Sequence, residues 1–180
     1  MMEKIMYDGK EYWRNGGRTG AKWADRNGLV VPIGIQNTLN VAYAASLRSD
    51  EMDFETLLKT ADEFKNSGSY GCAIRFYEYA VKKADASGLK GILPRLTSCY
   101  RAQGQPQKAI DILSYAKEKY GQKMITSALL VSAGAAYCDL KDYKRAKKCC
   151  NRAYAMLGKQ ATGEWKAVYG RIRKESGEVF

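Results

Sequence analysis

Residues 93–116 read LPRLTSCYRAQGQPQKAIDILSYA, and this stretch decides how the chain folds. Leu93 and Tyr100 are seven residues apart, a spacing that places both side chains on one face of an α-helix. Ala109 and Ala116 have the same spacing and therefore share one face of a second helix. We expect the alanines to let the two helix backbones approach closely, while the tyrosine fills the space beside them.

The residues between these two helices are turn formers. Gly104 suits the left-handed position after the end of a helix, and Pro106 suits the first turn of the next helix. A connection this short makes the two helices antiparallel neighbours. The stretch therefore predicts a helix–turn–helix unit.

The same pattern occurs three times, with periods of 36 and then 37 residues. The first-helix positions are Leu57, Ala61, Phe64, Leu93, Thr97, Tyr100, Leu130, Gly134 and Tyr137. The second-helix positions are Ala73, Tyr77, Ala80, Ala109, Leu113, Ala116, Ala146, Cys150 and Ala153. Self-similarity at a fixed period of this length is typical of helical repeat proteins, in which each unit buries its apolar face against the next.

The pattern resembles the tetratricopeptide repeat over about residues 54–158. It departs from the family motif in that leucine replaces the first tryptophan in all three copies and the terminal proline is missing. The resemblance implies an all-α fold, a right-handed superhelical array of antiparallel helix pairs with three repeats and seven or eight helices. It also implies a non-catalytic adaptor that binds a protein partner, as a peptide or a helix, in its concave groove.

The resemblance further implies where a partner binds, because the first helices of such arrays line the groove. The expected groove residues are Asp62, Lys65, Asn66, Arg95, Ser98, Arg101, Val131, Ala135 and Asp139. The family's clamp for a C-terminal carboxylate is absent, since the matching positions hold Leu58, Asp62, Arg95, Ala128 and Ser132. The small apolar wall of the third repeat suggests a packed helix or an apolar peptide as the ligand. The alternative is that some of these residues pack against the N-terminal segment.

Glycines mark the ends of the second helices, and a further helix follows the last repeat. The expected helix ends are Gly88, Gly121 and Gly158. Residues 161–175 then predict one more helix, whose apolar stripe is Trp165, Val168, Tyr169 and Ile172. A helical array needs such a cap to shield its last apolar face. We therefore expect a repeat domain over residues 51–180 that ends in a capping helix.

The first fifty residues have a different character, rich in glycine, tryptophan and tyrosine. Their Asn-Gly pairs predict tight hairpin turns between short strands, which we place at residues 10–14, 21–24 and 29–31. A helix follows up to Arg48, and Asp50 is the expected N-cap of the first repeat helix. We expect residues 1–50 to form a separate N-terminal cap segment.

The distribution of basic residues leaves a second function open. Residues 121–180 hold 12 basic and 5 acidic side chains, and the expected basic face is Lys144, Lys147, Lys148 and Arg152. The N-terminal segment mixes bases with aromatics at Lys10, Tyr12, Trp13, Arg14, Arg18, Lys22, Trp23 and Arg26. Together they indicate a nucleic-acid-binding accessory protein as the alternative function. The competing interpretations are a solubility face and an aromatic cap on the first repeat.

The sequence offers little for catalysis or metal binding. It has no histidine, and its five cysteines form no CxxC pair. The glycine-rich loop at residues 16–20 lacks the GK[ST] ending of a phosphate loop and predicts a hairpin tip. We expect no enzymatic activity, no cofactor and no metal, with reduced thiols in a cytoplasmic protein. We also expect no secretory signal and no membrane-spanning segment.

Overall fold

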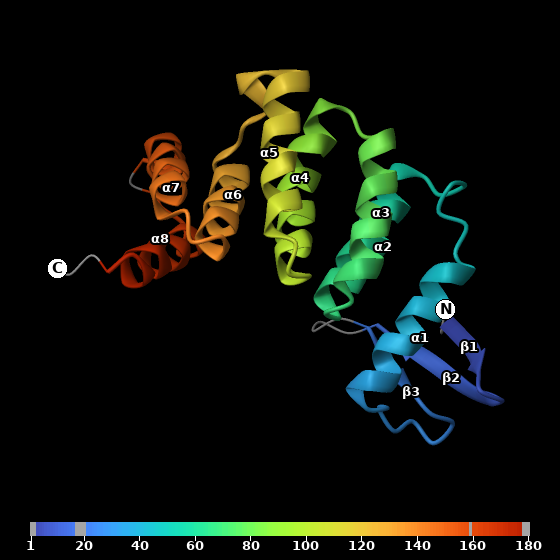
Figure 1. The fold of residues 1–180 in the computed structure, drawn as a ribbon. Coiled ribbons are helices and arrows are strands. Elements are labelled where there is room, and N and C mark those ends of the chain that lie inside the picture. Colours follow the sequence, from blue (N-terminus) through green and yellow to red (C-terminus); the bar gives the residue numbers. More distant parts are fainter. Residues whose placement is uncertain (1–2, 17–20, 159, 178–180) are drawn as a thin grey trace. The chain divides into compact units, whose positions relative to one another are not determined.

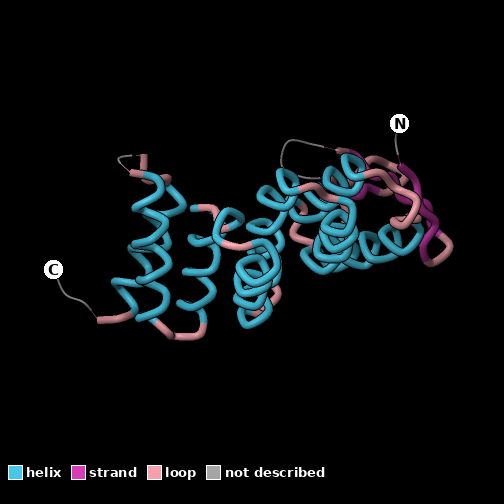
Figure 2. The backbone as a smooth tube through the Cα atoms, turned by 90° about the horizontal axis from the view of Figure 1, so that it is seen from above, coloured by secondary structure: helices cyan, strands magenta, loops and turns pink. Residues whose placement is uncertain are grey.

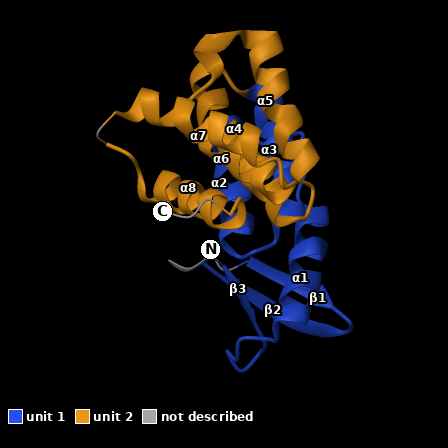
Figure 3. Ribbon diagram, turned by 60° about the vertical axis from the view of Figure 1, so that its left-hand side comes forward, with its two compact units in different colours: residues 1–83 blue, residues 84–180 orange. Residues whose placement is uncertain are grey.

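The computed structural model describes residues 3–16, 21–158 and 160–177. Over these residues the chain forms three β-strands, eight α-helices and one short 3₁₀-helix (Figure 1). Figure 2 shows the three strands together, and helices make up most of the rest. The elements form two compact units, residues 1–83 and residues 84–180 (Figure 3). The expected division after residue 50 falls inside the first unit and stays a prediction.

The strands form one antiparallel sheet in the order β1-β2-β3. They are β1 (Glu3–Tyr7), β2 (Lys10–Asn15) and β3 (Lys22–Ala24). The turn between β1 and β2 is Asp8-Gly9, with φ of 49° and 69°. Two consecutive residues at positive φ match the right-handed twist of a two-residue hairpin, and glycine adopts this conformation without steric cost.

Helix α1 (Ile33–Ser46) packs on the sheet around a buried tryptophan. Trp23 is fully buried against Leu39, and its indole Nε1 donates to Oδ1 of Asn40 at 2.8 Å. The backbone N–H and C=O of Trp23 both bond to the side-chain amide of Gln36, each at 2.8 Å. These hydrogen bonds give partners to polar groups that burial would otherwise leave unsatisfied, and they fix α1 against β3.

The first helix pair, α2 (Phe54–Asn66) and α3 (Tyr70–Lys83), belongs to the same compact unit as the sheet. Arg14 of β2 joins the sheet to α2, because its Nη1 donates to Oε2 of Glu63 at 3.0 Å. Its guanidinium also lies 5.3 Å from the ring centroid of Phe64. The N-terminal segment therefore covers part of the first repeat.

The second compact unit contains two helix pairs and the capping helix. Its elements are α4 (Ala86–Ala102), α5 (Pro106–Tyr120), η1 (Gln122–Met124), α6 (Ser127–Asp139), α7 (Tyr143–Leu157) and α8 (Gly163–Glu175). Helix α6 is the central element, since it contacts α4, α5, α7 and α8 and nine of its residues are buried. Many residues of α6 are alanine, serine or glycine, and these small side chains let the neighbouring helices pack closely around it.

The three helix pairs share one turn geometry. Residues 67–69, 103–105 and 140–142 connect the helices, and the middle residue has a positive φ each time. The last turn residue donates its backbone N–H to the carbonyl of the repeated aromatic residue at 2.9 Å, in the pairs Ser69–Phe64, Gln105–Tyr100 and Asp142–Tyr137. This hydrogen bond and the left-handed residue are those of a Schellman helix end. The repeat register is thus present in the backbone as well as in the side chains.

The predicted repeat core is confirmed. Fifteen of the eighteen predicted core positions are buried, and Tyr100, Leu113 and Tyr137 are half-buried. In the capping helix Ile172 is fully buried, and Trp165 packs against the same cluster. The capping helix therefore covers the third pair as expected.

Some local predictions at helix ends are wrong. The N-cap of α2 is Asp53, which accepts from the backbone N–H of Thr56 at 2.7 Å, and not Asp50. Gly88 lies inside the first turn of α4 and does not end α3, because Asp85 caps α4 by accepting from the Gly88 N–H. In both cases an aspartate fixes the helix start by accepting from the backbone N–H three residues after it.

The strand predictions are only partly correct. Residues 10–14 and 21–24 lie in or beside β2 and β3, whereas residues 29–31 contribute a single bridge from Val30 to Ala24. Pro32 and the start of α1 follow at once and leave no room for a longer strand. Strand β1 was not predicted. Of the hairpin tip expected at residues 16–20, residues 17–20 lie outside the described residues.

Candidate partner-binding site

A hollow of about 470 Å³ opens between the C-terminal ends of α4 and α6. Its lining residues are Ser98, Arg101, Ala102, Gly104, Pro106 and Asp139. Three of them, Ser98, Arg101 and Asp139, are among the groove residues expected from the sequence. The Schellman turn after α4 shapes one wall, because it brings the chain back over the helix end before α5 begins at Pro106. The hollow is therefore a product of the repeat geometry.

The polar side of the hollow is held by ion pairs on Asp139. Nε and Nη2 of Arg101 donate to the two carboxylate oxygens of Asp139 at 2.7 and 3.3 Å. Nη1 of Arg171, from the capping helix, donates to the same carboxylate at 2.6 Å. A paired guanidinium–carboxylate contact of this kind fixes both groups in orientation. Arg101 is thus held rigidly at the wall of the hollow.

The charges around Asp139 settle its protonation state. Burial alone raises the pKa of Asp139, but hydrogen bonds from Arg101 and Arg171 outweigh it and hold the pKa below its usual value. Burial, with a hydrogen bond to Glu175, raises the pKa of the nearby Cys138 thiol to about 11. The site therefore contains an ionised carboxylate between two guanidiniums and a protonated thiol at neutral pH.

The other expected groove residues of the second unit lie differently. Val131 and Ala135 are each only 2% exposed, because the neighbours of α6 enclose them. Their side chains offer almost no surface to a partner. Arg95 of α4 is half-buried and already interacts with another group of the chain.

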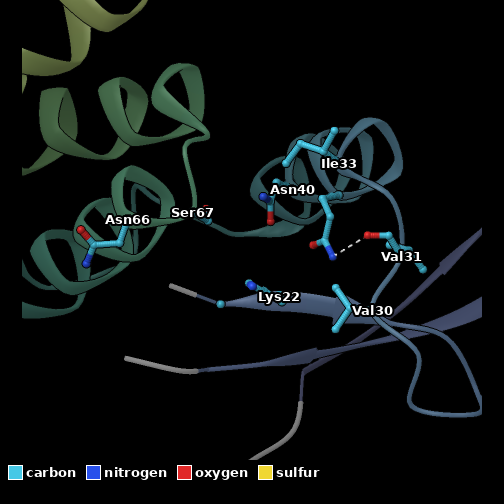
Figure 4. A pocket seen from close by; sticks show the side chains of 9 residues that line it. Lys22, Val30, Val31, Ile33, Asn40, Asn66 and Ser67 are labelled. Atoms are coloured by element: carbon cyan, nitrogen blue, oxygen red, sulfur yellow. Dashed lines mark hydrogen bonds between the residues drawn. The ribbon is translucent and has the colours of Figure 1, made fainter. Parts of the chain in front are cut away.

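The expected groove residues of the first repeat belong to residues 1–83. The carboxylate of Asp62 accepts a hydrogen bond from the hydroxyl of Tyr77, so it is engaged within its own helix pair. Lys65 is half-buried, and Asn66 is exposed. Asn66 lines a second, smaller hollow of about 250 Å³ beside α1 and β3, shown in Figure 4.

Comparison with known structures identifies the fold. The chain is similar to the crystal structure of the Sgt2 TPR domain from Aspergillus fumigatus, with a TM-score of 0.59, 22% sequence identity, and 69% of this chain and 80% of that chain covered. The chain has a tetratricopeptide-repeat fold. No protein-family model matches the sequence, and no curated protein matches it either. The tetratricopeptide register predicted from the aromatic and alanine positions is confirmed, as is the small sheet in the N-terminal segment.

The basic face expected for the alternative function lies on α7 of the tetratricopeptide fold. Lys144, Lys148 and Arg152 are exposed, whereas Lys147 is half-buried. Arg152 donates to the side-chain carbonyl of Gln122. The inner side of α7 carries the small residues of the repeat core, so its basic residues remain at the surface.

The aromatic residues of the N-terminal segment are largely unavailable as a surface, whereas its basic residues Lys10, Lys22 and Arg26 are exposed. Tyr12, Arg14 and Trp23 are 8%, 4% and 0% exposed, since they lie between the sheet and the helices. Trp13 is half-buried, and Arg18 lies outside the described residues. Buried rings have no free face on which a base can stack. The aromatic cap is the interpretation that this burial favours.

Sequence reasoning missed the contribution of the capping helix to the site. Arg171 and Glu175 are one helical turn apart, and Nε of Arg171 donates to Glu175 at 2.7 Å. From the sequence, that pair is an ordinary surface contact at i, i+4. The second contact of Arg171, to Asp139, depends on how α8 crosses the end of α6. No local signal predicts that crossing.

Two further findings concern the described part of the chain. It contains no group of three or more potential metal ligands. Among the same residues, no helix has the length and apolar character needed to cross a membrane.

Proposed function

We propose that the chain is a non-catalytic protein-interaction module whose partner binds at the hollow between α4 and α6. The hollow itself is the observation that carries the proposal, since Ser98, Arg101 and Asp139 line it together. Stacked helical repeats present extended surfaces that are suited to binding another chain. The partner is a peptide or a helix of another protein.

The polar groups of the hollow suit the main chain of such a partner. Arg101 uses Nε and Nη2 for Asp139, which leaves Nη1 to donate to a partner carbonyl. The hydroxyl of Ser98, three residues earlier on α4, supplies a second donor beside it. Because Asp139 fixes Arg101 in advance, binding loses little side-chain entropy. We therefore expect recognition of backbone carbonyls at a peptide turn or at a helix C-terminus.

A non-catalytic role is supported by the state of the thiols. Burial raises the pKa of Cys72, Cys138, Cys149 and Cys150, with Cys150 at about 12. A protonated thiol is a poor nucleophile, and the sequence has no histidine to activate it. All five cysteines are free, which fits a reducing compartment, and we propose the cytoplasm.

The test compares proteins captured from a cell extract by the immobilised full chain and by two variants. Ala102→Leu places a larger side chain in the hollow at an exposed position. Ser114→Leu makes a similar change at an exposed position on α5 and serves as the control. We expect a partner whose recovery falls about tenfold with Ala102→Leu and is unchanged with Ser114→Leu. Cross-links from this partner should map to the ends of α4 and α6.

Identical capture by all three proteins would contradict the proposal. Cross-links confined to other helices would contradict it as well, because they would place the partner elsewhere on the chain.

The exposed bases of α7 favour nucleic-acid binding as the second candidate function. Phosphate contacts release counterions, so affinity for RNA or DNA should fall steeply as salt is added. Reversing Lys144, Lys148 and Arg152 to glutamate should then abolish binding while Ala102→Leu leaves it intact. Capture of a protein through the hollow should show the opposite dependence on these variants.

A further inference from the structure

Helix α1 exposes a face without charge. Residues 27–47 contain no charged side chain, although 27% of the whole chain is charged. Ile33 and Val41 are 72% and 62% exposed, and their spacing of two turns places them along one side of the helix. A helix face directed to water normally carries charged or strongly polar residues. This side of α1 has the composition of a surface that another molecule covers.

The apolar surface continues into the loop before α1. Leu29 and Val30 are 67% and 60% exposed, and Pro32 follows them at the start of the helix. Together with Ile33 and Val41 they form what we call the α1 patch. Exposed apolar residues gathered on one element mark interaction sites, whereas single exposed ones are ordinary. Of these residues, Val30 and Ile33 line one hollow, and the exposed Asn37 separates Ile33 from Val41 along the helix.

A hollow adjoins the α1 patch at the helix start. It measures about 250 Å³ and is bounded by Val30 and Ile33, which belong to the patch, and by Lys22 of β3. Figure 4 shows these three side chains with Asn40 around the same space. Since Asn40 bonds to the Trp23 indole and to Ser69, its amide is already satisfied by the fold. An apolar group can therefore enter the hollow without displacing a structural hydrogen bond of Asn40.

Lys22 gives the hollow a positive rim. The side chain is exposed, and no carboxylate of the described residues forms a salt bridge with it. The first turn of α1 contains no acidic residue, and no side chain caps its N-terminus. The positive end of the helix dipole thus adds to the charge of Lys22 at this end of the patch.

We infer that the α1 patch binds a segment of a partner protein in which a large apolar side chain stands next to an aspartate or glutamate. The apolar side chain fills the hollow between Val30 and Ile33, and the carboxylate pairs with Lys22. This site lies in residues 1–83 and is independent of the function proposed for the hollow between α4 and α6. The occupant follows from the charge and the shape of the surface.

The same observations disfavour two other occupants. In a symmetric pair of α1 helices, a parallel arrangement would bring two copies of Lys22 together. These like charges repel. An antiparallel pair would bring Lys22 towards Arg48 of the second copy, which is already paired with Glu51, so the test below includes a dimer among its outcomes. A bilayer surface would contact the exposed side of α1 but would not fill a concave hollow. A protein segment satisfies both the apolar and the charged part of the site.

The experiment selects binders to the full chain from a library of random 12-residue peptides displayed on phage. Selected peptides should share a large apolar residue adjacent to aspartate or glutamate. Their affinity should fall about tenfold or more with Ile33→Asp and with Lys22→Glu. Lys59→Glu on α2 and Met156→Asp on α7 are matched controls at exposed positions and should leave the affinity unchanged.

A charge exchange makes the test specific for the pairing. A selected peptide whose acidic residue is replaced by lysine should lose affinity for the natural chain and regain it with Lys22→Glu. Ala102→Leu should not affect any of these peptides, so failure here and failure at the α4–α6 hollow are distinguishable. Peptides without an acidic residue, insensitivity to Ile33→Asp, or no selected peptide at all would overturn the inference. Two further results would also overturn it if peptide binding is absent: a dimer that Ile33→Asp abolishes, or binding to phosphatidylserine vesicles that Ile33→Asp abolishes.

Discussion

Gly134 of α6 lies against the backbone of Ala146 in α7, so closely that a Cβ atom on Gly134 would stand 3.3 Å from the Ala146 carbonyl oxygen. The same added atom would stand 3.0 Å from Sγ of Cys150. Contacts this short leave no room for a branched side chain. The third helix pair therefore depends on glycine at the position where the other two pairs carry Ala61 and Thr97.

Replacing Gly134 with valine should destabilise the protein by about 1–3 kcal/mol, because overpacking forces α6 and α7 apart. The control is Gly91→Ala in α4, where an added Cβ meets nothing within 4 Å. That change should stabilise the helix by about 0.5–1 kcal/mol, since alanine favours helix more than glycine does. Urea unfolding followed by circular dichroism measures both. Equal stability of the two variants would contradict the close crossing of α6 and α7.

Lys141 occupies the left-handed turn position that glycine fills in the other two repeats, with a φ of 61°. A non-glycine residue there is strained by roughly 1–2 kcal/mol. Lys141→Gly should relieve that strain. Glycine also raises the entropy of the unfolded chain, which offsets part of the gain, so the net stabilisation should be about 0.5–1 kcal/mol. The control Lys148→Gly, at an exposed position in the interior of α7, should instead destabilise by about 1 kcal/mol. Thermal unfolding distinguishes the two, and a lower melting temperature for Lys141→Gly would refute the assignment.

Asp139 should make stability depend on pH in the acid range. Its pKa is lower in the folded protein than in the unfolded chain, so its contribution is present above its ordinary pKa of about 4 and is lost as pH falls through the lowered value. Asp139→Asn should therefore destabilise the protein by about 1–3 kcal/mol at pH 7. The difference from the natural chain should shrink below about pH 4. A difference that stays constant from pH 7 to pH 2 would show that the ion pairs contribute nothing.

The repeat core could be predicted from the sequence because its signals are local. Leu93 and Tyr100 reveal one helix face, and Gly104 reveals the turn, without knowledge of any other part of the chain. The strands were harder to predict. Strand β1 is an exposed edge strand of five residues in which Lys4 and Met6 face away from the core, so its alternation is weak. The start of α2 was misplaced because Asp50 and Asp53 are equally good caps by residue type.

The candidate site was predictable only where it follows the repeat register. Ser98, Arg101 and Asp139 fall on the hollow because their positions within the first helices determine their direction. Val131 and Ala135 occupy similar positions but are buried, since the packing of several helices around α6 is a tertiary property. The contact between Arg171 and Asp139 depends in the same way on the path of the capping helix, which residue spacing does not encode.

The account depends most on the register that places Ala109 inside the second helix pair and Ala102 at the hollow. Ala109 is fully buried against Tyr100, whereas Ala102 is exposed. Thermal unfolding of Ala109→Leu and Ala102→Leu tests this directly. Ala109→Leu should lose about 1–3 kcal/mol, lowering the melting temperature by about 2–4 °C per kcal/mol, and Ala102→Leu should unfold close to the natural chain. Equal melting temperatures for the two variants, or an unimpaired Ala109→Leu, would contradict the register and with it the assignment of Ser98, Arg101 and Asp139 to the binding face.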